Sequence, residues 1–384
     1  MIKAVIMAGG QGTRLQPLTF VRPKPMIPLI NKPILSYSLD KLKSEGFSQV
    51  MVTLGYMWDH VKEYYKKNPP GLDLKYTIEK WPLGTAGGVR KARKYLDTTF
   101  VVLSGDVITE VDLNRAILYH QEKKALATLV LTRVDDPSHY GVADLDDDGK
   151  IVNYLEKPQP GEAFSNLANT GTYIMEPEIF DYMEDQRGVM DFSQHIFPQL
   201  IRDGKAIYGY PSQGYWNDVG RPETYLKATS DLLNSGSWGI QGERIKKRIG
   251  RIGDIWLGED VEMGERVHME GPVVIGDGVK IGSGTKISAA TVLGENVTLG
   301  KNVSIHGSVI FSNTVVNDNV FLENSIVDRQ CFIDKGSLVE NGVVIGCRVE
   351  IGMNSMIRSF RRITQDVKIF PGSIIDSDYL ISAE

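Results

Sequence analysis

Side chains that suit phosphate chemistry follow a glycine-rich break near the start of the chain. Residues 4–26 read AVIMAGGQGTRLQPLTFVRPKPM. Glycines at 9, 10 and 12 allow a tight turn and bring backbone N–H groups close to a polyphosphate. Arg14 can direct two donors at phosphate oxygens, and Lys24 adds a compact positive charge between two prolines. The spacing fits neither the Walker pattern nor GxGxxG, and a glycine-rich turn beside a solvated Arg and Lys is the alternative interpretation.

Two aspartates lie where an α/β sheet would present them to a phosphate. Asp106 follows the apolar run FVVLS, and Asp218 lies in YWNDVG before a predicted helix. A carboxylate in such a position can hold a hard divalent cation against phosphate oxygens. Taken alone, each aspartate is also a common turn or cap residue. Together with the glycine-rich segment they predict a site for magnesium or another divalent cation, in which the uncharged Asn217 would be a poorer ligand than Asp218.

The segments that must position these residues alternate between two patterns. Short apolar runs predict strands at 2–7, 50–54, 100–104 and 127–132. Patterned segments predict helices at 34–44, 113–123 and 221–234. This alternation predicts an α/β domain with a largely parallel, doubly wound sheet and its ligand at the carboxyl ends of the strands.

The remainder of the chain carries a six-residue repeat. Counted in sixes from Ile249 to Ile375, every position is β-branched or aromatic, and glycine recurs between them, as in IGDGVKIGSG. Such a period predicts a β-helix of three hexads per coil, with about seven coils. The count runs without interruption, which predicts that no inserted loop carries a second active site. We therefore expect a catalytic domain at 1–234, a linker at 235–248 and a β-helix domain at 249–384.

Composition excludes several classes of protein. The chain has 384 residues, a formal charge of −5 and 42% hydrophobic residues, without the basic excess of a nucleic-acid binder. No apolar run reaches the length of about 18 residues that a membrane helix requires. Two cysteines, Cys331 and Cys347, are too few for a disulfide framework and occupy different places in their hexads. We expect a cytoplasmic protein with no nucleic-acid or membrane partner.

The whole opening string, AGGxGTRLxPLTxxxPKPM, resembles that of the sugar-nucleotide pyrophosphorylases, which are sugar-1-phosphate nucleotidyltransferases. The hexad repeat is similar to the left-handed β-helix found at the C-terminus of many such enzymes. The resemblance implies a Rossmann-like nucleotidyltransferase domain followed by that β-helix. It assigns the catalytic roles to Arg14, Lys24, Asp106, Lys157 and Asp218, with magnesium held by Asp106 and Asp218. Nucleotide binding is expected at Ala8, Gly9, Gly10, Gly12, Thr13, Arg14, Lys24, Pro82, Gly84, Thr85 and Asp106.

Further segments resemble the parts of this family that hold the base and the sugar. PLGTAGG at 82–88 resembles the loop that packs on the nucleobase, and its sequence is closest to that of GDP-mannose pyrophosphorylases. The tripeptide at 156–158 resembles the family's EKP motif, although alone it would be an ordinary solvated turn. Sugar-phosphate binding is expected at Tyr140, Gly141, Glu156, Lys157, Asn169 and Gly171.

The resemblance leads to an expected reaction. We expect a nucleoside triphosphate and a sugar-1-phosphate to give a nucleotide sugar and pyrophosphate, with GTP and mannose-1-phosphate as the best match. UTP or dTTP with glucose-1-phosphate is the alternative, and so is a regulatory subunit that binds sugar nucleotides without turnover. The β-helix, with its open coil ends, is expected to mediate homo-oligomerisation.

Overall fold

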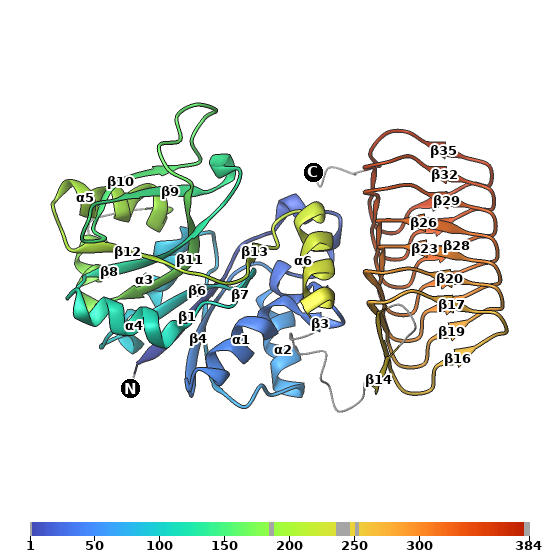
Figure 1. Ribbon diagram of the computed structural model, residues 1–384, viewed down its shortest axis with the longest axis horizontal. Helices are drawn as coiled ribbons and strands as arrows, with labels where there is room; N and C mark the ends of the chain where they lie inside the picture. Colours follow the sequence, from blue (N-terminus) through green and yellow to red (C-terminus); the bar gives the residue numbers. More distant parts are fainter. Residues whose placement is uncertain (1, 184–187, 236–245, 250–252, 380–384) are drawn as a thin grey trace. The chain divides into compact units, whose positions relative to one another are not determined.

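The computed structural model describes residues 2–183, 188–235, 246–249 and 253–379 (Figure 1). The chain divides into two compact units. The first unit contains Met1–Gln11, Pro23–Met26 and Ile34–Asp218, and the second contains Gly12–Arg22, Ile27–Pro33 and Val219–Glu384. Two short segments from the N-terminal part of the sequence therefore group with the repeat region. Most of the predicted linker at 235–248 lies outside the described residues.

The first unit is built on a mixed sheet. In the described part of the chain its strands follow the order β10 (Ile151–Glu156), β9 (Gly141–Leu145), β11 (Leu167–Met175), β6 (Phe100–Ser104), β1 (Lys3–Ala8), β4 (Gln49–Leu54) and β5 (Asp73–Ile78). Beside this path, β8 (Ala127–Arg133) pairs with β11 and with β12 (Ile207–Pro211). A separate ribbon pairs β7 (Val107–Thr109) with β13 (Trp216–Asp218).

Only one half of this sheet follows the predicted parallel arrangement. Strands β6, β1, β4 and β5 are parallel neighbours, whereas β11 runs antiparallel to β6, β8 and β9. Strands β9 and β10 are joined by the short turn at Asp146–Lys150, which only antiparallel neighbours can use. The parallel half has its carboxyl ends at one edge, and the predicted phosphate and metal residues follow those ends.

Helices cover both faces of the sheet. Alternation along β1 directs Ala4 and Ile6 into one core and Val5 into the other. The first core contains side chains from α1 (Ile34–Ser44), α2 (Trp58–Lys67) and α4 (Leu113–Glu122). The second contains side chains from α3 (Gly84–Lys91) and α5 (Phe197–Arg202). Both cores are apolar and closed, so the first unit holds the strand ends rigidly.

The second unit is a left-handed β-helix with three parallel faces, which confirms the predicted fold. Face 1 contains β15 (Asp254–Leu257), β18 (Val273–Ile275), β21 (Thr291–Leu293), β24 (Val309–Ile310), β27 (Ile326–Val327), β30 (Val344–Ile345) and β33 (Arg362–Ile363). Strand β14 (Lys246–Ile249) pairs antiparallel with β15 at the first coil. The coils stack along the orange to red part of the chain (Figure 1).

The other two faces follow the same stacking. Face 2 contains β16 (Glu262–Met263), β19 (Lys280–Ile281), β22 (Thr298–Leu299), β25 (Val315–Val316), β28 (Phe332–Ile333), β31 (Glu350–Ile351) and β34 (Lys368–Ile369). Face 3 contains β17 (His268–Met269), β20 (Lys286–Ile287), β23 (Ser304–His306), β26 (Phe321–Glu323), β29 (Leu338–Val339), β32 (Met356–Ile357) and β35 (Ile374–Ile375). Cys331 and Cys347 are buried free thiols, as their places in the hexads predicted.

The predicted unbroken hexad register is wrong. Lys280 stacks on Thr298, 18 positions on, but Thr298 stacks on Val315 and Val315 on Phe332, each only 17 positions on. Single residues are therefore omitted at two corners between faces 3 and 1. The count in sixes does not reveal these omissions, because outward-facing residues of face 1 such as Val309 are also apolar and buried. The corners are shortened rather than extended, so neither omission inserts a loop.

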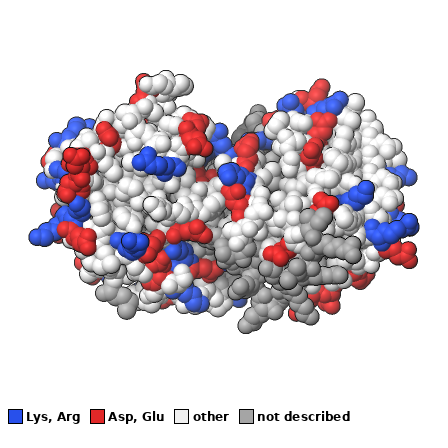
Figure 2. Space-filling model, in the orientation of Figure 1, with Lys and Arg blue, Asp and Glu red and all other residues white. Residues whose placement is uncertain are grey.

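The surface and the helices agree with the composition. On the face drawn in Figure 2, basic and acidic side chains are interspersed and form no single basic patch. Among the described residues, no helix combines the length and apolar character needed to cross a membrane.

Candidate active site

Three of the predicted catalytic side chains meet at the strand ends of the first unit. Asp106 follows β6, and Asp218 ends β13, where its pairing with Val107 of β7 brings it beside Asp106. The buried Lys24 donates a hydrogen bond from Nζ to Asp106 Oδ2, and Nζ lies 3.6 Å from Asp218 Oδ1. The structure thus brings together one ammonium group and two carboxylates from three distant parts of the sequence.

Asp106 and Asp218 offer two carboxylates to a divalent cation. Burial alone would raise the pKa of Asp106, but the charge of Lys24 and hydrogen bonds from Lys24 and Ser104 lower it overall. Mg²⁺ is commonly held by one or two carboxylates together with substrate phosphates. Within the described ranges no group of three or more His, Cys, Asp or Glu side chains could hold a metal, so substrate oxygens and water would complete the shell. The donor set therefore fits magnesium.

A cavity of about 310 Å³ opens beside this cluster. It lies at the carboxyl ends of β1, β4 and β6, where an open α/β sheet binds its ligands. Backbone of Gly9 and Gly10 forms part of its wall, and Gly105 N–H donates to Met7 O at 2.9 Å, which ties the ends of β6 and β1 together. Of the residues predicted to bind nucleotide, those lining the cavity are Ala8, Gly9, Gly10, Lys24, Pro82, Gly84, Thr85 and Asp106.

The predicted nucleobase loop is partly a helix. Residues 84–88 form the first turns of α3, which starts at Gly84 with a φ of 77°. A Cβ at Gly84 would collide with the carbonyl oxygen of Met190. The Thr85 backbone N–H and Oγ1 donate to Asp191 Oδ1 at 2.9 and 3.0 Å. Asp191 also lines the cavity and fixes the start of α3, and no motif in the sequence pointed to it.

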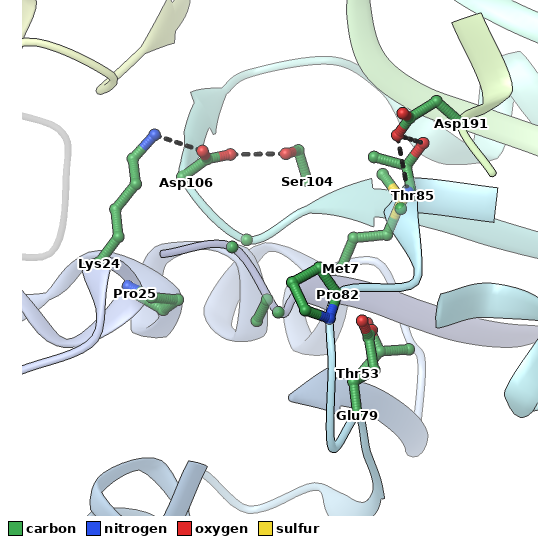
Figure 3. Close-up of a pocket in the computed structure, with 15 residues that line it drawn as sticks. Met7, Lys24, Pro25, Thr53, Glu79, Pro82, Thr85, Ser104, Asp106 and Asp191 are labelled. Carbon is green, nitrogen blue, oxygen red and sulfur yellow. Dashed lines mark hydrogen bonds and ion pairs between the residues drawn. The ribbon is translucent and has the colours of Figure 1, made fainter. Parts of the chain in front are cut away.

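Glu79 is the functional candidate that motif reasoning missed. It follows β5 as Asp106 follows β6, and its N–H donates to Leu54 O of β4 at 2.7 Å. Its Oε2 accepts from the Leu83 N–H at 3.2 Å, and the absence of side chains at Gly9 and Gly88 leaves it room. Burial raises the pKa of Glu79. Glu79 and Lys24 lie at opposite ends of the cavity (Figure 3).

The predicted sugar-phosphate residues lie together on β9, β10 and β11. Glu156 pairs with Gly141, and the Lys157 N–H donates to Tyr140 O at 2.9 Å. A Cβ at Gly141 would collide with the Tyr154 hydroxyl, so this position requires glycine. Lys157 has a φ of 50°, a left-handed conformation that an L-residue adopts at some cost and that often marks a functional site.

The Asn169 side chain has hydrogen-bond partners within β10 and β11. Its Nδ2 donates to the hydroxyls of Tyr154 and Tyr173 at 3.0 and 3.1 Å, and its Oδ1 accepts from the Gly171 N–H at 2.9 Å. Both amide hydrogens are therefore directed at tyrosines. A Cβ at Gly171 would lie 3.1 Å from the Cβ of Ser104, so β11 passes close to the strand that precedes Asp106.

The remaining predicted nucleotide residues belong to the second unit. Gly12, with a φ of 66°, precedes a short 3₁₀ helix, η1 (Thr13–Leu15). The side chains of Thr13 and Arg14 are exposed. The chain leaves the cavity wall after Gly10 and returns to it at Lys24.

Comparisons with known proteins agree with this geometry. Residues 3–235 match the nucleotidyl transferase family, and residues 252–357 match the EIF2B subunit epsilon LbH domain. A UTP–glucose-1-phosphate uridylyltransferase of Synechocystis sp. is 36% identical over 264 residues, covering 65% of this chain and 68% of that protein. A mannose-1-phosphate guanylyltransferase of Mycobacterium tuberculosis is 34% identical over 235 residues, covering 60% of this chain and 65% of that protein. These curated relatives are thus matched over about two thirds of their own length.

Solved structures show the same catalytic fold. HddC from Yersinia pseudotuberculosis matches 59% of this chain and 98% of its own, with 30% identity and a TM-score of 0.52. A second structure of that protein, complexed with GMP-PN, matches with 29% identity and a TM-score of 0.52. The opening motif, the cavity at the strand ends and the match over residues 3–235 lead to one conclusion: the chain belongs to the nucleotidyl transferase family of sugar-nucleotide pyrophosphorylases.

Proposed function

We propose that this protein transfers GMP from GTP to mannose-1-phosphate, giving GDP-mannose and pyrophosphate. The observation that carries the nucleotide choice is the ionisable Glu79 at the end of the cavity opposite Lys24 and Asp106. The phosphates would lie at the Lys24 end and the base at the Glu79 end. The sugar choice is supported by relatives named mannose-1-phosphate guanylyltransferase and by the PLGTAGG segment.

A carboxylate at the base end favours guanine. Guanine presents two adjacent donors, N1–H and the N2 amino group, and a carboxylate accepts hydrogen bonds with both oxygens. Uracil and thymine present one N–H between two carbonyl oxygens, so one of those oxygens would face a carboxylate oxygen. Adenine and cytosine place a ring-nitrogen acceptor beside their amino group. Among the five common bases, guanine alone offers two neighbouring donors on this edge.

The phosphate end supplies positioning and charge for an in-line displacement. An oxygen of the sugar-1-phosphate attacks the α-phosphorus, a new P–O bond forms, and the α–β bridging bond breaks to release pyrophosphate. Lys24 and Arg14 would hold the triphosphate, and Lys157 the attacking phosphate, so two anions meet in a fixed orientation. Magnesium, held by Asp106 and Asp218, would neutralise charge on the α-phosphate. No covalent enzyme intermediate is required.

Replacing Lys157 tests the sugar-phosphate half of the site. We expect Lys157→Ala to raise the KM for the sugar-1-phosphate about ten- to hundredfold, because a charge-assisted contact contributes roughly 1.5–3 kcal/mol. The KM for the nucleotide should change much less. Steady-state kinetics with each substrate varied in turn measure both constants. Equal losses for the two substrates would mean that Lys157 does not hold the sugar phosphate.

A substrate panel tests the proposed reaction itself. Pyrophosphate release is measured with GTP, ATP, CTP, UTP and dTTP against mannose-, glucose- and N-acetylglucosamine-1-phosphate. We expect the highest kcat/KM for GTP with mannose-1-phosphate. Preference for UTP with glucose-1-phosphate would favour the activity named for the Synechocystis relative. Binding without pyrophosphate release would point to a regulatory subunit, although Arg14, Lys24, Asp106, Lys157 and Asp218 are all present.

We also propose that the β-helix mediates homo-oligomerisation. Its last coils expose apolar side chains, of which Phe360, Phe370 and Ile374 are 61%, 72% and 62% exposed. Exposed apolar side chains of this size favour association. Light scattering on the full chain tests this, and a monomeric mass at micromolar concentration would contradict it.

A further inference from the structure

On face 1 of the β-helix, the position after the inward-facing residue is Gly276, Gly294 or Gly346 in three coils, where a Cβ would lie 2.6–2.8 Å from the backbone of the next coil. Three coils depart from this glycine pattern: the coil of β33, with Thr364, and the two adjacent coils of β24 and β27. In the coils of β24 and β27 the same position is Phe311 and Asp328. Strands β24 and β27 come directly after the two corners at which a residue is omitted. The two adjacent departures place a ring and a carboxylate side by side on face 1.

Both side chains contact Arg22 of the segment Gly12–Arg22. Arg22 Nη2 donates to Asp328 Oδ1 at 2.6 Å, and the guanidinium carbon lies 5.4 Å from the centroid of the Phe311 ring. Arg22 is 6% exposed and Asp328 is fully buried. The two residues are 306 positions apart in the sequence. An ion pair removed from water in this way is directional, and loss of either charge leaves the other buried without its partner.

The same segment is held by face 1 at a second point. Arg362 of β33 donates from Nη1 to the carbonyl oxygens of Arg14 and Gln16, at 3.2 and 3.4 Å. Toward the other end of face 1, Asn31 Nδ2 of the segment Ile27–Pro33 donates to Leu293 O of β21 at 3.0 Å. These contacts extend along face 1 from β21 to β33. The segment Gly12–Arg22 has short 3₁₀ turns as its only regular structure among the described residues, so such contacts determine its conformation.

We propose that Asp328, through Arg22, is a positioning residue for the segment Gly12–Arg22. The β-helix then serves as the rigid support of this segment, in addition to any role in assembly. A segment without α-helix or strand loses conformational entropy when it is ordered, and prior ordering by the β-helix lowers that cost when a ligand binds. The effect on catalysis rests on the proposed function, which assigns a phosphate contact to Arg14. The effect on the conformation of the segment Gly12–Arg22 does not depend on the proposed function.

Hydrogen exchange on the full-length protein tests the support directly. The probes are the amides of Leu15, Gln16 and Phe20, which donate to Gly12 O, Thr13 O and Pro17 O within the segment. We expect Asp328→Asn to accelerate their exchange about tenfold or more, because the opened state of the segment becomes more populated. Arg22→Lys, which leaves the β-helix unchanged, should act in the same direction. Asp366→Asn is the matched control, since it removes an Arg–Asp pair with Arg348 elsewhere in the β-helix.

Kinetics on the same variants separate this inference from the proposed function. We expect the KM for the nucleoside triphosphate to rise at least fivefold in Asp328→Asn, while the KM for the sugar-1-phosphate stays unchanged. The hydrogen-exchange rates of the β-helix amides should also stay unchanged. Unchanged exchange at Leu15, Gln16 and Phe20 in both Asp328→Asn and Arg22→Lys would overturn the support. Faster exchange in a protein without transferase activity would uphold the support and reject the proposed function.

Discussion

Asp106→Asn is expected to fold and to lose roughly 99% to 99.9% of its turnover, a hundredfold to a thousandfold effect. The amide keeps the volume of the side chain but removes the charge that would hold a divalent cation. Asp218, at 3.6 Å from Lys24 Nζ, keeps the lysine partnered, so the fold should survive the change. The measurement is kcat at saturating substrates over a magnesium titration, with circular dichroism to check the fold.

The control for this variant is an aspartate with the same kind of partner away from the cavity. Asp148 accepts from Lys123 Nζ at 2.6 Å and is exposed, so Asp148→Asn removes an Asp–Lys pair without touching the site. Its turnover should equal that of the parent protein. If Asp106→Asn turned over at the parent rate at every magnesium concentration, neither a metal role nor a positioning role for Asp106 would remain.

The position of Asp106 beside the glycine-rich segment could be predicted because strand ends are readable in a sequence. Apolar runs mark β1 and β6, and parallel strands place whatever follows them at one edge, so Asp106 was expected near the glycine-rich segment. The sequence does not predict that Lys24 lies between Asp106 and Asp218. Asp218 comes beside Asp106 only through the antiparallel pairing of two three-residue strands, β7 and β13. Such short strands carry no periodic signal.

Glu79 and Asp328 escaped prediction for different reasons. Glu79 follows the strand β5, whose half-exposed pattern resembles an ordinary surface strand, so nothing in the sequence marks an acidic residue at its end as part of a site. Asp328 breaks the glycine position of face 1, but that position can be recognised only when the two shortened corners are known. After each shortened corner, a count in fixed sixes falls on a different position of the coil, and the residue at that position is again apolar. Pattern analysis therefore captured the fold, while contacts between distant segments needed the structure.

Those distant contacts also change what the β-helix is expected to do. The hexad repeat alone predicts an assembly domain separate from catalysis. In the structure Tyr225 of α6 (Pro222–Ser235) is fully buried, donates to Pro28 O at 2.5 Å and lies with its ring 6.5 Å from that of Phe311. Removal of the β-helix would expose this side chain and leave Arg22 without Asp328. Arg22, Tyr225 and the β-helix therefore all contribute to the core of the second unit.

Glu79→Gln is expected to shift nucleotide preference away from GTP by about a hundredfold or more in kcat/KM. The amide keeps one acceptor but replaces the other with a donor, which faces the N–H groups of guanine. Leaving those groups without partners in a closed site is costly, and hydrogen-bonding sites discriminate strongly for that reason. The same amide complements the N–H and neighbouring carbonyl of uracil, so kcat/KM for UTP should rise.

Glu110→Gln provides the comparison for this variant. Glu110 Oε2 accepts from the Tyr215 N–H at 3.1 Å, much as Glu79 accepts from Leu83, but Glu110 does not line the cavity. Its replacement should leave the GTP to UTP ratio unchanged. A ratio that stayed at the parent value in Glu79→Gln would place the base elsewhere and remove the argument for guanine.

Acidification should reproduce part of the Glu79→Gln effect. Burial raises the pKa of Glu79, so on acidification this carboxyl becomes protonated at a higher pH than an ordinary glutamate. The neutral acid presents an O–H donor to a base edge that also donates, and the KM for GTP should therefore rise as the pH falls through that raised pKa. The titration is measured as KM for GTP against pH in the parent and in Glu79→Gln. Because the amide does not ionise, its profile should lack this acidic limb, and an identical limb in both proteins would assign the titration to another group.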